Sequence, residues 1–111
     1  MKQNVKFLYL YRDAGNNKQY NEVVFSNESG MSIDHLRTTI ENNLIEGQWF
    51  VAKDLGLQDM FFKEYGWDPD LDHNWHEFED VEMTEEATTS EEDIADFLAT
   101  LSSQKYDNVF D

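Results

Sequence analysis

The residues of this chain that are able to do chemistry concentrate in one stretch, residues 66–84. It holds seven acidic residues, no Lys or Arg, two of the three Trp, two of the three His and the single Pro. Carboxylates and imidazoles bind divalent cations and transfer protons, and aromatic side chains inside a charged rim bind partner proteins. The composition therefore leaves three interpretations open: a cation site, a histidine-centred site or a contact surface.

The cation interpretation rests on the spacing of oxygen ligands. A twelve-residue frame carries them at positions 1, 3, 5, 7 and 12, namely Asp68, Asp70, Asp72, Asn74 and Glu79. This spacing resembles the ligand pattern of an EF-hand loop, in which alternate carboxylates converge on Ca²⁺. The frame departs from that pattern at position 6, where His73 replaces the usual Gly. A Ca²⁺ site formed by these five residues is one alternative hypothesis.

The histidine interpretation rests on His73 and His76, which lie three residues apart with Glu77 next to them. On a helix the two imidazoles would share a face and could hold a transition metal, whereas on a strand they would point to opposite faces. The chain has no Cys, and we find no nucleophile motif, no Gly-rich phosphate loop and no further ligand beyond the distant His35. We therefore predict that the protein is not an enzyme, and keep general-base chemistry at these histidines as a third hypothesis.

The contact-surface interpretation combines aromatic anchors with an acidic rim. The sequence Asp68-Pro69-Asp70 is typical of a turn, and Trp67 and Trp75 flank it. Exposed Trp beside carboxylates is the usual composition of a hot spot for a basic partner. The predicted partner-binding residues are Trp67, Asp68, Asp70, Asp72, Trp75, Glu91, Glu92 and Asp96.

The net charge of −16 belongs entirely to the second half of the chain. Residues 1–53 hold six acids and six bases, whereas residues 54–111 hold eighteen acids and two bases. Such a surface repels phosphates, which argues against direct binding of nucleic acid. In size and charge the chain resembles immunity-type inhibitors and nucleic-acid mimics, which cover basic proteins. We expect a basic protein partner; acidity that serves only solubility is the remaining alternative.

Composition predicts one domain that spans residues 1–111. Apolar residues make up 40% of the chain, which is enough to fill a core, and the absence of Cys excludes a disulfide framework. Residues 1–6 lack the apolar run of a signal peptide, and no stretch reaches transmembrane length, so we expect a cytoplasmic location and no membrane partner.

Four segments have the residue pattern of strands: 5–12, 20–26, 58–65 and 75–84. The first has apolar residues on both faces, which predicts a strand inside the sheet. Residues 48–57 fit either a short strand or an apolar loop with one helical turn. Phe78 and Val81 are an odd number of residues apart, so the last strand needs a bulge near residues 79–80 to bury both.

Two segments have helical spacing. Ser32 is the expected N-cap of a helix over residues 33–44, which Gly47 would end. A capping box at residues 90–93 would start a second helix, whose apolar stripe is Ile94, Phe97, Leu98 and Leu101. We therefore predict an α+β fold in the order strand, strand, helix, strand, strand, helix: a mainly antiparallel sheet of about four strands with two helices packed on one face.

Overall fold

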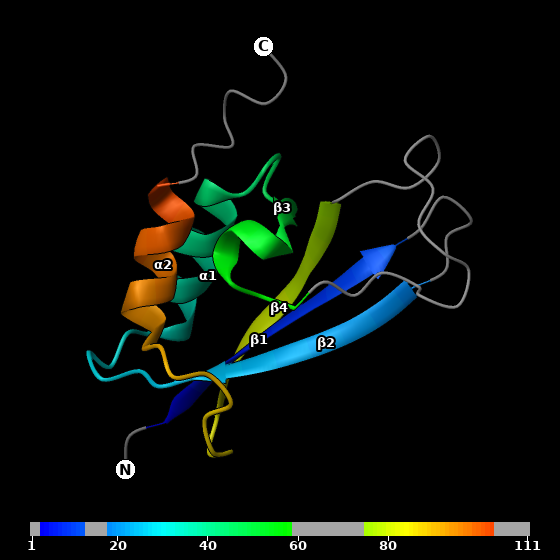
Figure 1. The fold of residues 1–111 in the computed structure, drawn as a ribbon. Coiled ribbons are helices and arrows are strands. Elements are labelled where there is room, and N and C mark those ends of the chain that lie inside the picture. Colours follow the sequence, from blue (N-terminus) through cyan, green and yellow to red (C-terminus); the bar gives the residue numbers. More distant parts are fainter. Residues whose placement is uncertain (1–2, 13–17, 59–74, 104–111) are drawn as a thin grey trace.

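The computed structural model describes residues 3–12, 18–58 and 75–103. Its elements in chain order are β1 (Asn4–Arg12), β2 (Lys18–Phe25), α1 (Ile33–Asn43), β3 (Trp49–Val51), η1 (Ala52–Leu55), β4 (Trp75–Thr84) and α2 (Ile94–Ser103). The strands form one antiparallel sheet in the order β2-β1-β4-β3. Both helices cover the same face of this curled sheet, as Figure 1 shows, which confirms the predicted α+β fold.

Strand β1 lies inside the sheet, between β2 and β4, as its two apolar faces predict. Val5, Phe7 and Tyr9 are fully buried on the face that the helices cover. Leu10, on the opposite face, is only 6% exposed. A strand that is apolar on both faces is stable in the middle of a sheet because neighbouring strands shield it on both sides.

The predicted bulge in β4 is confirmed. Tyr9 pairs with Phe78 and Leu8 pairs with Asp80, so Glu79 is an extra residue with no partner in β1. The extra residue restores the alternation of faces, and Phe78 and Val81 both pack toward the core. Glu79 itself is exposed.

The third strand of the sheet comes from the ambiguous segment. Residues 49–51 form β3, and residues 52–55 form the 3-10 turn η1. The segment therefore contains both the short strand and the helical turn that the sequence left as alternatives. Phe50 is fully buried opposite His76, and Trp49 is half-buried. The strand expected over 58–65 lies outside the described residues, apart from Gln58.

Of the three helix ends predicted from the sequence, one is confirmed and two are wrong. The side chain of Ser32 accepts a hydrogen bond from the His35 N–H at 3.2 Å, as expected for an N-cap. Helix α1 ends at Asn43, earlier than Gly47 suggested, because the chain already turns into extended backbone at Leu44. Helix α2 is capped by Asp93, whose carboxylate accepts from the Ala95 N–H at 3.0 Å, and not by Ser90.

Asp93 is the N-cap because it also joins α2 to the end of β2. Its carboxylate accepts hydrogen bonds from the Ser26 hydroxyl at 2.8 Å and from the Glu28 N–H at 2.9 Å. The Ile94 N–H donates to the Ser26 carbonyl at 2.8 Å. These long-range partners fix the start of the helix, and no local pattern in the sequence encodes them.

Candidate functional site

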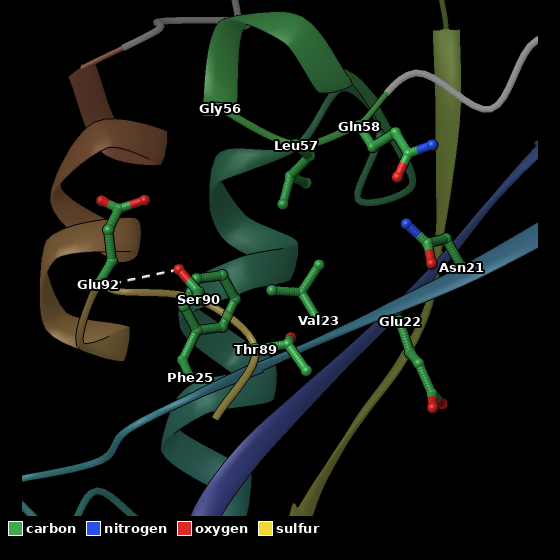
Figure 2. A pocket seen from close by; sticks show the side chains of 10 residues that line it. All are labelled: Asn21, Glu22, Val23, Phe25, Gly56, Leu57, Gln58, Thr89, Ser90 and Glu92. Atoms are coloured by element: carbon green, nitrogen blue, oxygen red, sulfur yellow. Dashed lines mark hydrogen bonds between the residues drawn. The ribbon is translucent and has the colours of Figure 1, made fainter. Parts of the chain in front are cut away.

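A pocket of about 310 Å³ opens between the edge of β2, the segment after η1 and the segment that leads into α2. Figure 2 shows the side chains of its ten lining residues. They are Asn21, Glu22, Val23, Phe25, Gly56, Leu57, Gln58, Thr89, Ser90 and Glu92. The lining combines three chain segments that are far apart in sequence, so it exists only in the folded protein.

The inner wall of the pocket is apolar. Phe25 and Leu57 belong to the core, at 1% and 8% exposure, and the half-buried Val23 packs against the same cluster. Phe25 is held by the ring of Phe97 in α2, at a centroid distance of 4.7 Å. Phe25 and Leu57 thus form the buried base of the wall, and Val23 offers most of the apolar surface that an aliphatic group could contact.

A chain of hydrogen bonds fixes one side of the pocket. The Asn21 side-chain amide donates to the Tyr9 hydroxyl at 3.0 Å, and the Tyr9 hydroxyl donates to the Gln58 carbonyl at 2.7 Å. Tyr9 is fully buried, so its hydroxyl connects β2 to the segment after η1 from within the core. Because the Asn21 amide is oriented by its NH₂ group, its carbonyl oxygen stays available as an acceptor.

The opposite side is formed by the segment that leads into α2. The Thr89 and Ser90 N–H groups donate to the Val24 carbonyl at 2.9 and 3.2 Å, and the Val24 N–H donates to the Thr89 hydroxyl at 2.9 Å. The Ser90 hydroxyl accepts from the Glu92 N–H at 3.1 Å, an interaction drawn in Figure 2. These bonds hold Glu92 at the rim of the pocket.

The charged groups of the lining are acidic. Glu92 lies at the rim, while the carboxylate of Glu22 points away from Val23 and Leu57, toward the open face of the sheet (Figure 2). Lys and Arg are absent from the ten lining residues. The pocket therefore combines an apolar wall with hydrogen-bond acceptors and a negative rim.

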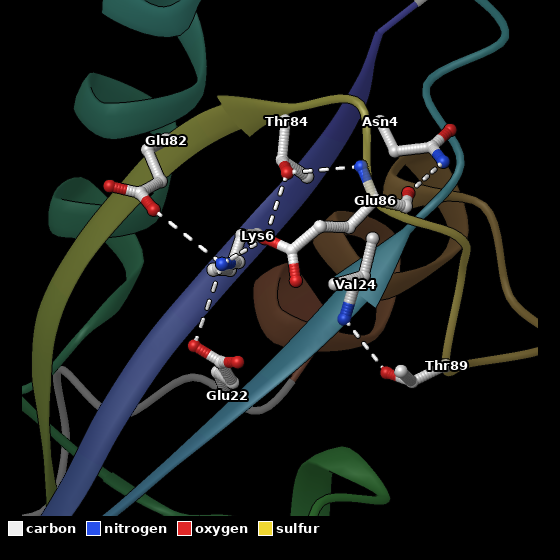
Figure 3. A network of polar contacts seen from close by, with 8 residues as sticks. All are labelled: Asn4, Lys6, Glu22, Val24, Glu82, Thr84, Glu86 and Thr89. Atoms are coloured by element: carbon white, nitrogen blue, oxygen red, sulfur yellow. Dashed lines mark hydrogen bonds and ion pairs between the residues drawn. The ribbon is translucent and has the colours of Figure 1, made fainter.

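Lys6 lies at the centre of an acidic cluster on the open face of the sheet (Figure 3). Its ammonium group is 3.7 Å from the Glu22 carboxylate and 3.8 Å from the Glu82 carboxylate, and it is paired most closely with Glu86. The hydrogen bond to Glu86 is the main cause that raises the pKa of Lys6, and the same bond, aided by Thr84, lowers the pKa of Glu86.

Two arginines are also engaged with carboxylates of the chain. Arg12 Nε donates to Glu77 at 2.7 Å, and this hydrogen bond is the main cause that raises the pKa of Arg12. Arg37 donates to the Asp80 carboxylate at 3.1 Å and to the Val81 carbonyl at 3.3 Å. Arg37 therefore connects α1 to the edge of β4.

The predicted partner-binding residues fall into three groups. Glu91 and Asp96 are exposed at the start of α2, and Glu92 is half-buried at the pocket rim. Trp75 is half-buried in β4 and packs against the core. The remaining four, Trp67, Asp68, Asp70 and Asp72, lie outside the described residues.

Most of the predicted cation site also lies outside the described residues. This holds for Asp68, Asp70, Asp72 and Asn74, whereas Glu79 is exposed at the bulge of β4. Within residues 3–12, 18–58 and 75–103, no three His, Asp or Glu side chains are grouped so that they could hold a metal ion.

His76 is a core residue. It is fully buried, and its ring lies 5.2 Å from Tyr11, 5.9 Å from Tyr9 and 6.0 Å from Phe50 between centroids. It does not line the pocket described above. His73 lies outside the described residues.

Sequence reasoning missed most of the pocket. Asn21, Gln58 and Ser90 come from three separate segments, and no spacing rule connects them. Of the ten lining residues, only Glu92 is also among the partner-binding residues predicted from the sequence.

Comparison of the chain with protein-family models, with curated proteins and with solved structures found no match. None of the helices in the described part of the chain is both long and apolar enough to cross a membrane. The site is therefore interpreted from its own geometry and charge.

Proposed function

We propose that this chain is a non-enzymatic acidic interaction module that binds a basic protein. The observation that carries the proposal is the distribution of charge at the surface. Lys6, Arg12 and Arg37 are each paired with carboxylates of the chain itself. Glu85, Glu91 and Asp96 are exposed and form no ion pair with any described residue.

This arrangement directs the uncompensated charge outward. Cations that are engaged internally cannot neutralise the acids of residues 85–96, so this surface attracts basic partners and speeds their association. A nuclease bound by an immunity-type inhibitor, or a DNA-binding protein bound by a nucleic-acid mimic, would present such a basic surface.

The proposal is tested with a fluorescent peptide rich in Lys and Arg, whose binding is measured by anisotropy over a series of NaCl concentrations. We expect affinity to fall as NaCl rises, because salt screens exposed charges. The double variant Glu91→Lys, Asp96→Lys should weaken binding by about tenfold, which corresponds to about 1.4 kcal/mol.

The matched control is Glu41→Lys, Glu46→Lys, which changes the net charge equally at exposed positions on and after α1. We expect this control to weaken binding by no more than about twofold, because the two carboxylates lie outside the proposed surface. If both double variants lost the same affinity for the peptide, attraction by net charge alone would explain the binding. That result would contradict the proposal and favour the alternative in which the acidity serves only solubility.

A further inference from the structure

Strand β2 has a partly open edge beside the pocket. It is the outermost strand of the sheet, and the hydrogen bonds of Val24 to Thr89 show that the Val24 backbone groups point away from β1. In an antiparallel pair these directions alternate along the strand, so the backbone groups of Glu22 and Tyr20 point outward as well. Residues 89–90 occupy this edge at Val24 only.

No described residue bonds to the outward N–H and C=O groups of Tyr20 and Glu22. Tyr20 is 54% exposed, and the Glu22 side chain is 52% exposed, so this part of the edge is accessible. An unpaired strand edge is a template for another extended chain, which gains its affinity from main-chain hydrogen bonds. The bonds at Val24 show that outward backbone groups of this strand do take hydrogen-bond partners from another segment.

The pocket lies on the inner face of the sheet next to this edge. A chain that pairs with β2 directs alternate side chains to opposite faces. A residue opposite Asn21 would therefore point to the inner face, where the pocket opens, and its two neighbours would lie beside Tyr20 and Glu22 on the open face. The pocket thus selects one side chain of the added strand.

The chemistry of the pocket selects a long basic side chain. The apolar wall of Val23 and Leu57 suits the aliphatic stem of Lys or Arg, and the charged end is then directed to the acceptors of Asn21 and Gln58. Glu92, on the other side of the pocket, adds a negative charge to the rim (Figure 2). On the open face, Glu22 favours a second basic residue.

We propose that β2 binds an extended basic segment of a partner protein by strand addition at Tyr20 and Glu22, with a Lys or Arg side chain in the pocket. This rests on the proposed function and specifies how the basic partner binds.

The test uses the capped peptide Thr-Arg-Lys-Arg-Thr and hydrogen exchange of the whole protein followed by NMR. In the proposed register the two Arg pair with Tyr20 and Glu22, and the central Lys enters the pocket. We expect the Tyr20 and Glu22 amide protons to be protected at least about tenfold by the peptide. The Val24 amide, already bonded to Thr89, should change little.

Methylation of the peptide backbone provides matched controls that leave the protein untouched. Methyl groups on both Arg nitrogens remove the bonds to β2 and should weaken binding by at least about tenfold, whereas a methyl group on the Lys nitrogen, which faces away, should change it by about twofold at most. Replacing the central Lys by Glu should abolish binding.

The outcomes separate the two proposals. If the peptide binds without protecting Tyr20 and Glu22, or if the two methylated peptides bind equally, strand addition is wrong while the acidic interaction module stands. If no basic peptide binds, the proposed function fails. Protection that increases with protein concentration in the absence of peptide would show that a second copy pairs with this edge, and would overturn the inference.

Discussion

At the scale of the residue, Lys6 and Glu86 link protonation to stability. Folding lowers the pKa of Glu86, so its contribution is present above its ordinary value of 4.5 and is lost as the pH falls through the lowered value. Lys6 has the opposite sign: its pKa is raised, so its contribution is full below 10.5 and is lost only as the pH rises through the raised value. At acidic pH, Glu86 is therefore the member of this pair whose protonation changes the stability of the protein.

We predict that Glu86→Gln makes stability less sensitive to acid. The variant keeps the size of the side chain but removes the charge that pairs with Lys6, so its free energy of unfolding should fall less than that of the wild type between about pH 6 and about pH 3. Urea denaturation at several pH values measures this. Glu85→Gln, at an exposed neighbour, should retain the wild-type dependence. If the free energy of unfolding of Glu86→Gln fell with pH as steeply as that of the wild type, the prediction would be contradicted.

At the scale of the element, the bulge of β4 decides which side chains are buried. Glu79 has no partner in β1, and its insertion keeps His76 and Phe78 on the side of the core while Val81 remains there too. The edge beyond the bulge is bound by Arg37, which donates to the Val81 carbonyl, while the Val81 N–H donates to Asp80. Arg37 and Asp80 thus bind backbone groups of β4 where β3 no longer covers its edge.

We predict that deletion of Glu79 is far more harmful than its truncation. Deletion would move His76 and Phe78 to the opposite face, and we expect a loss of about 3 kcal/mol or more in the free energy of unfolding. Glu79→Ala keeps the extra residue and should change stability by less than about 0.5 kcal/mol, because the side chain is exposed. Urea denaturation compares them, and a deletion variant as stable as Glu79→Ala would show that the bulge is dispensable.

At the scale of the whole molecule, charge opposes compaction. The net charge is −16, and the cations Lys6, Arg12 and Arg37 already pair with carboxylates. The remaining acids repel one another, which destabilises the compact state but favours the approach of a basic partner. The same imbalance thus lowers stability and supports the proposed binding.

We predict that NaCl raises the melting temperature of the protein. Between about 10 mM and about 300 mM salt, screening weakens repulsion among exposed carboxylates more than it weakens partly buried ion pairs. Glu91→Lys, Asp96→Lys should melt higher than the wild type at low salt and respond less to NaCl. Calorimetry measures both. A melting temperature that falls with NaCl would show that the internal ion pairs dominate.

The sequence by itself determined the elements whose signals are local. Two apolar faces placed β1 inside the sheet, the odd spacing of Phe78 and Val81 required the bulge, and Ser32 marked the start of α1. Each signal depends on residues within a few positions of one another, where periodicity and capping act.

The tertiary structure alone decided the candidate site. Sheet order and register bring Asn21, Gln58 and Ser90 around one pocket, and the bonds of Asp93 to Ser26 and Glu28 set the start of α2. Such contacts join segments tens of residues apart, and their energies depend on the geometry of the folded sheet, not on neighbouring residues. The sequence therefore indicated the acidic excess of the second half, while the fold decided which segments line the pocket.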